Sequence, residues 1–324
     1  ASCMNLAPYS DTIYVLSLST LTNVWWEGFA DSESGISSYS VGLGSGDCGT
    51  TNLLPLQSVG LNTGWSIDNV LMTAAEADEL DGMAADLGDA QIHIVVQVWN
   101  KAGLAAEACS GHIKLDTSSP EAGVVLDGPE GEGTGVDIDF QQSHSQINAH
   151  WVDFSDPESG VVRYEWAIGS GKQPGQQVMR FTDVGLETTG VCTANKCSVL
   201  TDAITYFVRI RAWNAAGQYT EVVSDGVLVD SQAPYGGAVW IVDDNALDAG
   251  YQSSLSSFIV RWSGFVDDVS GIASYSVGVG TAPGEADVDG FTLVVNIGNT
   301  SATSVRISDS VVVIDALYYI GVRA

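Results

Sequence analysis

Short segments in which apolar and polar residues alternate recur along the whole chain. Residues 204–212 read ITYFVRIRA and residues 258–262 read FIVRW. A period of two sends one face of a strand to a core and the other to solvent. Turns rich in Gly, Asn, Asp and Pro separate these segments. The pattern predicts an all-β chain of sandwiches, each of roughly a hundred residues.

One motif occurs three times. Residues 26–42 read WEGFADSESGISSYSVG, residues 151–169 read WVDFSDPESGVVRYEWAIG, and residues 262–278 read WSGFVDDVSGIASYSVG. Trp, Phe, Asp, Ser, Gly and Tyr keep the same offsets in all three copies. Self-similarity of this kind indicates an internal repeat.

A second motif supports the same period. VVQVWNKAG at 95–103 matches VRIRAWNAAG at 208–217, so that Trp99 and Trp213 lie 114 residues apart. The segments 116–120 and 230–234, which run from Asp to Pro, have the same separation. Proline fixes its own φ and extends the preceding residue, which makes these segments short, stiff linkers. We therefore expect modules at 1–117, 118–231 and 232–324.

The third copy stops early. Ala324 aligns with Ala212, before the Trp-Asn pair that ends this strand in the other copies. We expect the third module to lack its last strand in this segment. Either the segment belongs to a longer chain, or a neighbouring molecule supplies the strand.

The order of these features resembles the fibronectin type III family and its immunoglobulin-like relatives. A Trp near the end of an early strand precedes a Tyr-bearing strand, and a later Tyr strand ends in Asn-x-x-Gly. The resemblance implies three tandem sandwich modules and no catalytic or binding role. Ile92 stands where the other modules have Tyr206 and Tyr318, which leaves a tyrosine-corner hydrogen bond open in the first module.

An insertion distinguishes the first module. Thr73 and Glu76 have the spacing of a capping box. Leu80, then Met83 or Ala84, and then Leu87 follow at helical spacing. We expect a short helix at about 73–87 over the edge of the sandwich, serving either for packing or as a contact between subunits.

Charge and hydropathy exclude several classes of protein. The chain has 40 acidic and 11 basic residues, a net charge of −29. Nucleic acid and anionic membrane surfaces would repel it. No apolar run approaches the roughly 18–20 residues of a membrane helix. The first residues lack the charged start and apolar core of a signal peptide, so the chain resembles a mature or excised segment.

The five cysteines point to local disulfides. Cys192 and Cys197 bracket a four-residue loop, a spacing that suits a disulfide better than a metal site without further ligands. Cys48 and Cys109 lie in predicted loops of the first module and are candidates to pair. Cys3 would then remain for a partner outside the segment.

No motif of catalysis is present in the sequence. The four histidines are scattered, and none pairs with a carboxylate at zinc-peptidase spacing. The GSGKQ stretch at 169–173 is too short for a phosphate loop and has Gln173 in place of the required hydroxyl. No Gly-x-Ser-x-Gly elbow occurs. We therefore expect a protein that is not an enzyme.

The Asp-x-x-Ser-Gly loops have two interpretations. Each holds two carboxylates, which makes the loops weak candidates for calcium, the one cofactor that the sequence suggests. Calcium takes six or more oxygens, more than one loop supplies. Alternatively, Asp accepts backbone N–H bonds in an Asx-type turn while Gly takes a positive φ. The carboxylates are Asp31, Glu33, Asp156, Glu158, Asp267 and Asp268.

Aromatic residues and one sequon suggest contacts. Trp26, Trp151 and Trp262 repeat in phase with the strands, which predicts core positions. The other Trp candidates, for contact with a neighbouring subunit or a glycan, are Trp25, Trp166 and Trp240. Asn299 begins the N-glycosylation triplet Asn-Thr-Ser.

These observations favour an extracellular or cell-surface structural protein. The preferred hypothesis is a subunit of a glycoprotein filament or appendage that associates with itself or with neighbouring modules of a longer chain. The repeat also resembles repeats in secreted proteins of bacteria, algae and protists, including mastigoneme glycoproteins of flagellar hairs. The alternatives are an adhesin or ligand-binding ectodomain, and spacer modules of a secreted enzyme.

Overall fold

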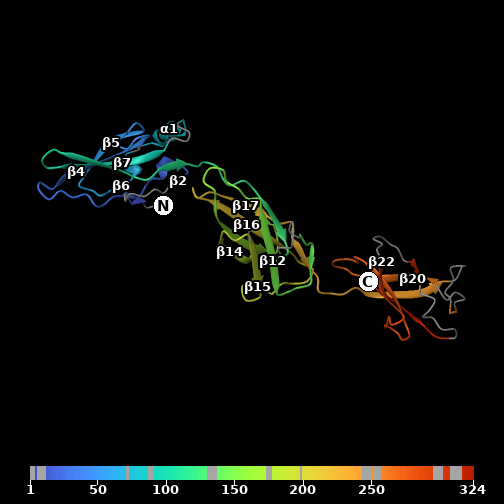
Figure 1. Cartoon of the computed structure of the whole chain (residues 1–324). Coiled ribbons are helices and arrows are strands. Elements are labelled where there is room, and N and C mark those ends of the chain that lie inside the picture. The colour runs from blue at the N-terminus through green and yellow to red at the C-terminus, as the bar shows by residue number, and fades with distance from the viewer. Residues whose placement is uncertain are drawn as a thin grey trace. The chain divides into compact units, whose positions relative to one another are not determined.

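The computed structural model describes residues 4–5, 12–70, 73–86, 91–129, 137–172, 177–197, 199–242, 250–251, 257–294, 302–306 and 316–324. Strands dominate these residues, and three groups of strands follow one another along the chain (Figure 1). By compactness the chain divides into two units. One comprises 1–137, 147–192 and 207–225, and the other comprises 138–146, 193–206 and 226–324. The all-β prediction is confirmed.

The first module is a sandwich of two sheets. One sheet has the order β1-β3-β6, and the other has the order β2-β9-β7-β4-β5 with β8 also paired to β7. Their strands are β1 (Met4–Asn5), β2 (Ile13–Val15), β3 (Val24–Trp25), β4 (Ile36–Ser45), β5 (Leu54–Gly60), β6 (Gly64–Trp65), β7 (Ile92–Asn100), β8 (Ala105–Cys109) and β9 (Ile113–Leu115). Two short 3₁₀ helices complete the module, η1 (Leu18–Thr20) and η2 (Ile67–Asn69).

The predicted insertion forms helix α1 (Ala74–Ala85). Thr73 and Glu76 make both reciprocal bonds of the capping box. Leu80 and Ala84 are buried in the module's core, whereas Met83 is exposed. Asp81 accepts a 2.7 Å bond from the Leu18 N–H. The helix therefore packs on the sandwich beside η1, and Leu87 lies outside the described residues.

The second module repeats this arrangement. One sheet has the order β10-β12-β15, and the other has the order β11-β18-β16-β13-β14 with β17 also paired to β16. Its strands are β10 (Val124–Asp127), β11 (Phe140–Gln141), β12 (Gln146–Val152), β13 (Val161–Gly169), β14 (Gln177–Gly185), β15 (Thr189–Thr193), β16 (Thr205–Asn214), β17 (Tyr219–Val223) and β18 (Val227–Val229).

The third module has two three-stranded sheets among its described residues, β19-β20-β23 and β22-β21-β24. Its strands are β19 (Tyr235–Val242), β20 (Ser257–Val266), β21 (Tyr275–Gly280), β22 (Asp289–Val294), β23 (Ala302–Arg306) and β24 (Tyr319–Arg323). Strand β24 occupies the position of β7 and β16, since each pairs with the Tyr-bearing strand β21, β4 or β13.

The threefold motif builds the same aromatic cluster in every module. Trp26, Trp151 and Trp262 are each at most 2% exposed, as predicted for core positions. Each packs on the motif's tyrosine at 5.3–5.9 Å between ring centroids, and the motif's phenylalanine meets the same tyrosine at 5.7–5.9 Å. Edge-on aromatic packing of this kind adds to the stabilisation from burial. The recurring Trp, Phe and Tyr are therefore explained as core.

The tyrosine corner is present in the second module. Tyr206 is buried, and its hydroxyl accepts a 2.9 Å bond from the Thr201 N–H. Ile92 takes the equivalent place in the first module and is buried without a hydroxyl. That module holds its strand by hydrophobic packing at this point instead.

Candidate functional site

The Asp-x-x-Ser-Gly loops share one local geometry. In the first module Asp31 Oδ1 accepts the N–H groups of Ser34 at 2.6 Å and of Gly35 at 2.8 Å. Gly35 has φ +75°, in the left-handed region that favours glycine. Asp31 Oδ2 accepts a 3.0 Å bond from the Asn100 amide at the end of β7. Hydrogen bonds from Asn100 and from the two N–H groups hold the pKa of Asp31 well below its usual range.

The other two loops repeat this turn. Asp156 accepts the N–H groups of Ser159 and Gly160, at 2.8 and 3.0 Å, and Gly160 has φ +74°. Burial raises the pKa of Asp156, but hydrogen bonds from Ser159, the Asn214 amide and Gly160 outweigh it and leave the pKa lowered. These contacts are those of the Asx-type turn.

Asp267 follows the same rule in the third module. Its Oδ1 accepts the Ser270 and Gly271 N–H groups, both at 2.9 Å. Burial again raises the pKa, and the backbone hydrogen bonds bring it below the usual range. Its neighbour Asp268 instead accepts a 2.7 Å bond from the Tyr235 hydroxyl.

A linker aspartate joins the second of these loops. Asp116 is only 1% exposed. Its N–H donates to the Val15 carbonyl of β2, and its Oδ2 accepts a 2.9 Å bond from the Asn214 amide and a bond from the Ser159 hydroxyl. The same Asn214 amide reaches Asp156 Oδ2 at 3.1 Å. One amide thus bridges two buried carboxylates, one in the linker and one in the following module.

The arrangement around Asp116 offers a cation three carboxylates. Oxygens of Asp116, Asp156 and Glu158 lie within 4.8 Å of one another. Calcium takes six to eight oxygens, so water would have to supply the remainder. The carboxylates of Asp116 and Asp156 already accept bonds from Asn214 and Ser159, and Glu158 accepts the Ser118 hydroxyl at 3.0 Å. A cation here would compete with those donors.

Another acidic group lies beyond the predicted residues. Asp127, Asp137 and Asp225 place carboxylate oxygens within 4.8 Å of one another. Across the described ranges, neither the Asp31–Glu33 pair nor the Asp267–Asp268 pair belongs to a group of three potential ligands. Of the predicted calcium candidates, only Asp156 and Glu158 are brought together with a third acid.

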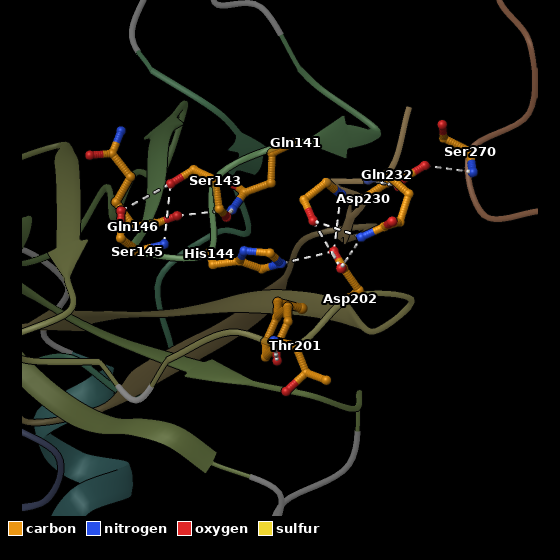
Figure 2. A network of polar contacts seen from close by, with 12 residues as sticks. Gln141, Ser143, His144, Ser145, Gln146, Thr201, Asp202, Asp230, Gln232 and Ser270 are labelled. Carbon is orange, nitrogen blue, oxygen red and sulfur yellow. Dashed lines mark hydrogen bonds and ion pairs between the residues drawn. The ribbon is translucent and has the colours of Figure 1, made fainter. Parts of the chain in front are cut away.

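The second linker repeats the role of the first. Asp230 Oδ2 accepts a 3.1 Å bond from the Ser270 backbone N–H (Figure 2). Asp116 Oδ2 accepts from the equivalent Ser159, but from its hydroxyl. Asp230 Oδ1 accepts the Gln232 N–H at 2.9 Å. A linker aspartate therefore bonds to the serine of the following Asp-x-x-Ser-Gly loop at both junctions.

A histidine–aspartate pair lies beside this linker (Figure 2). His144 Nε2 is 2.8 Å from Asp202 Oδ1, and Ser231 donates both its N–H and its hydroxyl to Asp202 at 2.9 Å. The bond to His144 is the largest of several that lower the pKa of Asp202 to about 2. The group ties the loop before β16 to the start of the linker.

The three tryptophans that were predicted as contact residues differ in their exposure. Trp25 is 38% exposed and remains a contact candidate, and Trp240 is half-buried on β19. The expectation for Trp166 is wrong, because this residue is 4% exposed and stacks 6.3 Å from the core Trp151. A Cβ at Gly190 would come within 3.0 Å of its ring, so the core is built around it.

The predicted pairing of Cys48 with Cys109 is confirmed, although Cys109 lies at the end of a strand and not in a loop. Cys48 and Cys109 form a disulfide that joins the loop before β5 to the end of β8. Cys192 and Cys197 are both buried and disulfide-bonded. Cys3 and the sequon residue Asn299 lie outside the described residues.

Sequence reasoning did not single out the residues that organise these sites. Asp116, Asp230, Asn100 and Asn214 all belong to motifs that recur at 114 residues. That recurrence was visible, but it did not show that the linker and the Asn-x-x-Gly turn converge on the acidic loop.

Comparisons with known proteins found similar solved structures but no matching sequence. No protein-family model and no curated protein sequence matches it. The FN1–FN3 domains of chicken CNTN1 share 12% identity over 72% of this chain and 71% of that one, with a TM-score of 0.32. The fibronectin(III)-like modules of Clostridium thermocellum CbhA share 10% identity over 69% and 92%, with a TM-score of 0.35.

Two bacterial adhesins are also similar. A Ca²⁺-stabilised adhesin with which an Antarctic bacterium binds ice shares 13% identity over 99% of this chain and 72% of its own, with a TM-score of 0.32. A 1.5-MDa bacterial ice-binding adhesin shares 17% identity over 85% and 76%, with a TM-score of 0.34. None of the four is described as a flagellar-hair protein. In the described part of this chain, no helix is long and apolar enough to span a bilayer.

Proposed function

We propose that this chain is a non-catalytic structural segment of an extracellular filament or cell-surface appendage, built from tandem β-sandwich modules. The observation that carries the proposal is the repeated linker aspartate. Asp116 and Asp230 each bond to the serine of the next module's acidic loop. A linker tied down in this way, together with its proline, resists the free rotation that a flexible tether would allow.

The disulfides support an extracellular location. The Cys48–Cys109 disulfide and the disulfide-bonded Cys192 and Cys197 belong to oxidising compartments. The net charge of −29 favours solubility and opposes non-specific association with anionic surfaces. Glycosylation at Asn299 and assembly with other subunits belong to the same proposal.

Immunogold labelling of intact cells from the source organism tests this function. Antibodies raised against residues 12–242 should decorate extracellular fibres or appendages without permeabilisation. Labelling confined to permeabilised cells would overturn the proposal. Labelling spread over the surface, with no fibre beneath the gold, would favour the second candidate below.

The second candidate is an adhesin or ligand-binding ectodomain. It is favoured by the exposed aromatic side chains of the first module, Trp25 and Trp99, which are 38% and 37% exposed. Exposed aromatic side chains are enriched at binding surfaces. The two candidates differ in whether the chain's neighbours are copies of itself or a foreign surface.

A further inference from the structure

The outward face of the β8-β7-β4 sheet in the first module contains a shallow hollow of about 520 Å³ that is wide open to solvent. The hollow is lined by Trp99, Asn100, Lys101 and the serines Ser37, Ser38 and Ser40. Trp99 stands directly opposite Ser38 on β4 and Ala105 on β8. Both neighbours are small, so 37% of the Trp99 side-chain surface stays open to solvent.

In the second module, larger side chains occupy the position that corresponds to this hollow. Trp213 is the counterpart of Trp99, and its cross-strand neighbours are Arg163 and Tyr219. The Arg163 guanidinium lies 4.2 Å from the Trp213 ring centroid, and the Tyr219 ring lies 4.6 Å from it. With the same register, the second module packs a guanidinium and an aromatic ring on Trp213, whereas only small side chains stand opposite Trp99, which is 37% exposed.

The other residues on this face of the sheet also differ between the first and the second module. Opposite Gln97 the first module has Ser40, whereas opposite Arg211 the second has Glu165. Arg211 stacks 3.7 Å from the ring of Phe181 and bonds to Glu221 at 2.9 Å. Salt bridges and stacked rings thus occupy the second module's face, and hydroxyl groups line that of the first.

The chemistry of the hollow selects its ligand. The exposed part of the Trp99 indole suits a small apolar surface, while serine hydroxyls both donate and accept and the Lys101 ammonium donates. No hydrogen bond within the described part of the chain occupies the hydroxyls of Ser38 and Ser40. A wholly apolar ligand would bury them without partners, at a cost in free energy.

A pyranose ring satisfies both requirements, because it has a face of C–H groups and a rim of hydroxyls. An anionic polymer is disfavoured by the chain's net charge of −29. We propose that the Trp99 hollow binds a neutral oligosaccharide, with one sugar ring stacked on the indole and its hydroxyls bonded to Ser38, Ser40 and Lys101. This is a binding activity of the first module beyond a structural role.

Titration of the ¹⁵N-labelled chain with neutral hexaoses tests the proposal, the probes being cello-, laminari-, malto- and mannohexaose. The nine tryptophans give nine indole N–H signals, and Trp99→Phe identifies the one from Trp99. We expect at least one hexaose to shift that signal saturably at concentrations up to about 20 mM, since a single open site binds in the millimolar range. The signals of Trp25, exposed outside the hollow, and of Trp213 should stay in place.

The matched variant copies the second module. Ser38→Arg with Ala105→Tyr should cover Trp99 as Arg163 and Tyr219 cover Trp213, and weaken binding at least tenfold. The other eight indole signals show that this variant is folded. Absence of a saturable Trp99 shift with all four hexaoses overturns the proposal, as does a shift that the double variant retains.

Discussion

Asn214 donates to two carboxylates at once, Asp116 in the linker and Asp156 in the acidic loop. Both acids are at least nine-tenths buried. Buried charges without a donor are expensive, whereas paired and hydrogen-bonded ones are tolerated. The amide therefore contributes more than an ordinary surface hydrogen bond, because it offsets the cost of two buried charges.

Asn214→Ala should lower the free energy of unfolding of the second module by about 2–4 kcal/mol, since it leaves those two carboxylates short of a donor. Differential scanning calorimetry of the whole chain would measure the loss. The matched control is Asn100→Ala in the first module, where the amide bonds one carboxylate that is only half-buried. Equal losses in the two variants would contradict the bridging role.

Asp202 gives a prediction on pH. Its pKa is lowered to about 2, first by the bond to His144. A carboxylate whose folded pKa is depressed contributes stability above its ordinary pKa, and this contribution disappears as pH falls through the folded value. The difference in melting temperature between the native chain and Asp202→Asn should therefore shrink as pH falls from about 4 to 2. A difference that does not change down to pH 2 would refute this.

Among the structural elements, the core positions of the aromatic clusters follow directly from the sequence, because Trp26, Trp151 and Trp262 recur in phase with the strands. The capping box at Thr73 likewise fixed the start of α1. Trp166 could have been placed correctly as well. It aligns with Val41 and Val277 of the other copies, and all three are buried.

The convergence of linker and loop was beyond sequence reasoning. Asp116 and Asn214 are 98 residues apart, and nothing local to either residue encodes their contact. The open face around Trp99 was equally hidden. The exposure of Trp99 depends on which side chains lie opposite it on the neighbouring strands. Those partners are set by the register in which β4, β7 and β8 pair.

The Cys48–Cys109 disulfide joins two elements of the first module, the loop before β5 and strand β8. Its cysteines are 61 residues apart, and a loop of that length corresponds to about 4 kcal/mol of chain-entropy stabilisation. Replacing both cysteines by alanine should destabilise the first module by about that amount. Calorimetry should show the other modules unfolding at unchanged temperatures. A shift spread over all three transitions would mean that the modules do not unfold independently.

At the scale of the whole molecule, a repeated module and a repeated linker contact recur along one chain. Each module buries its own Trp–Tyr–Phe cluster, and each linker aspartate bonds to the module that follows. Repetition of this kind suits a protein that spans distance rather than one that gathers groups around a reaction. The net charge of −29 opposes non-specific association between such chains.

Cryo-electron microscopy of the native assembly isolated from its source is the most direct test of the structural role. We expect regular fibres in which these three modules repeat and contact neighbouring subunits or further modules of the same chain. Single, unassembled molecules under native conditions would contradict the filament role and leave the ligand-binding ectodomain as the function to pursue.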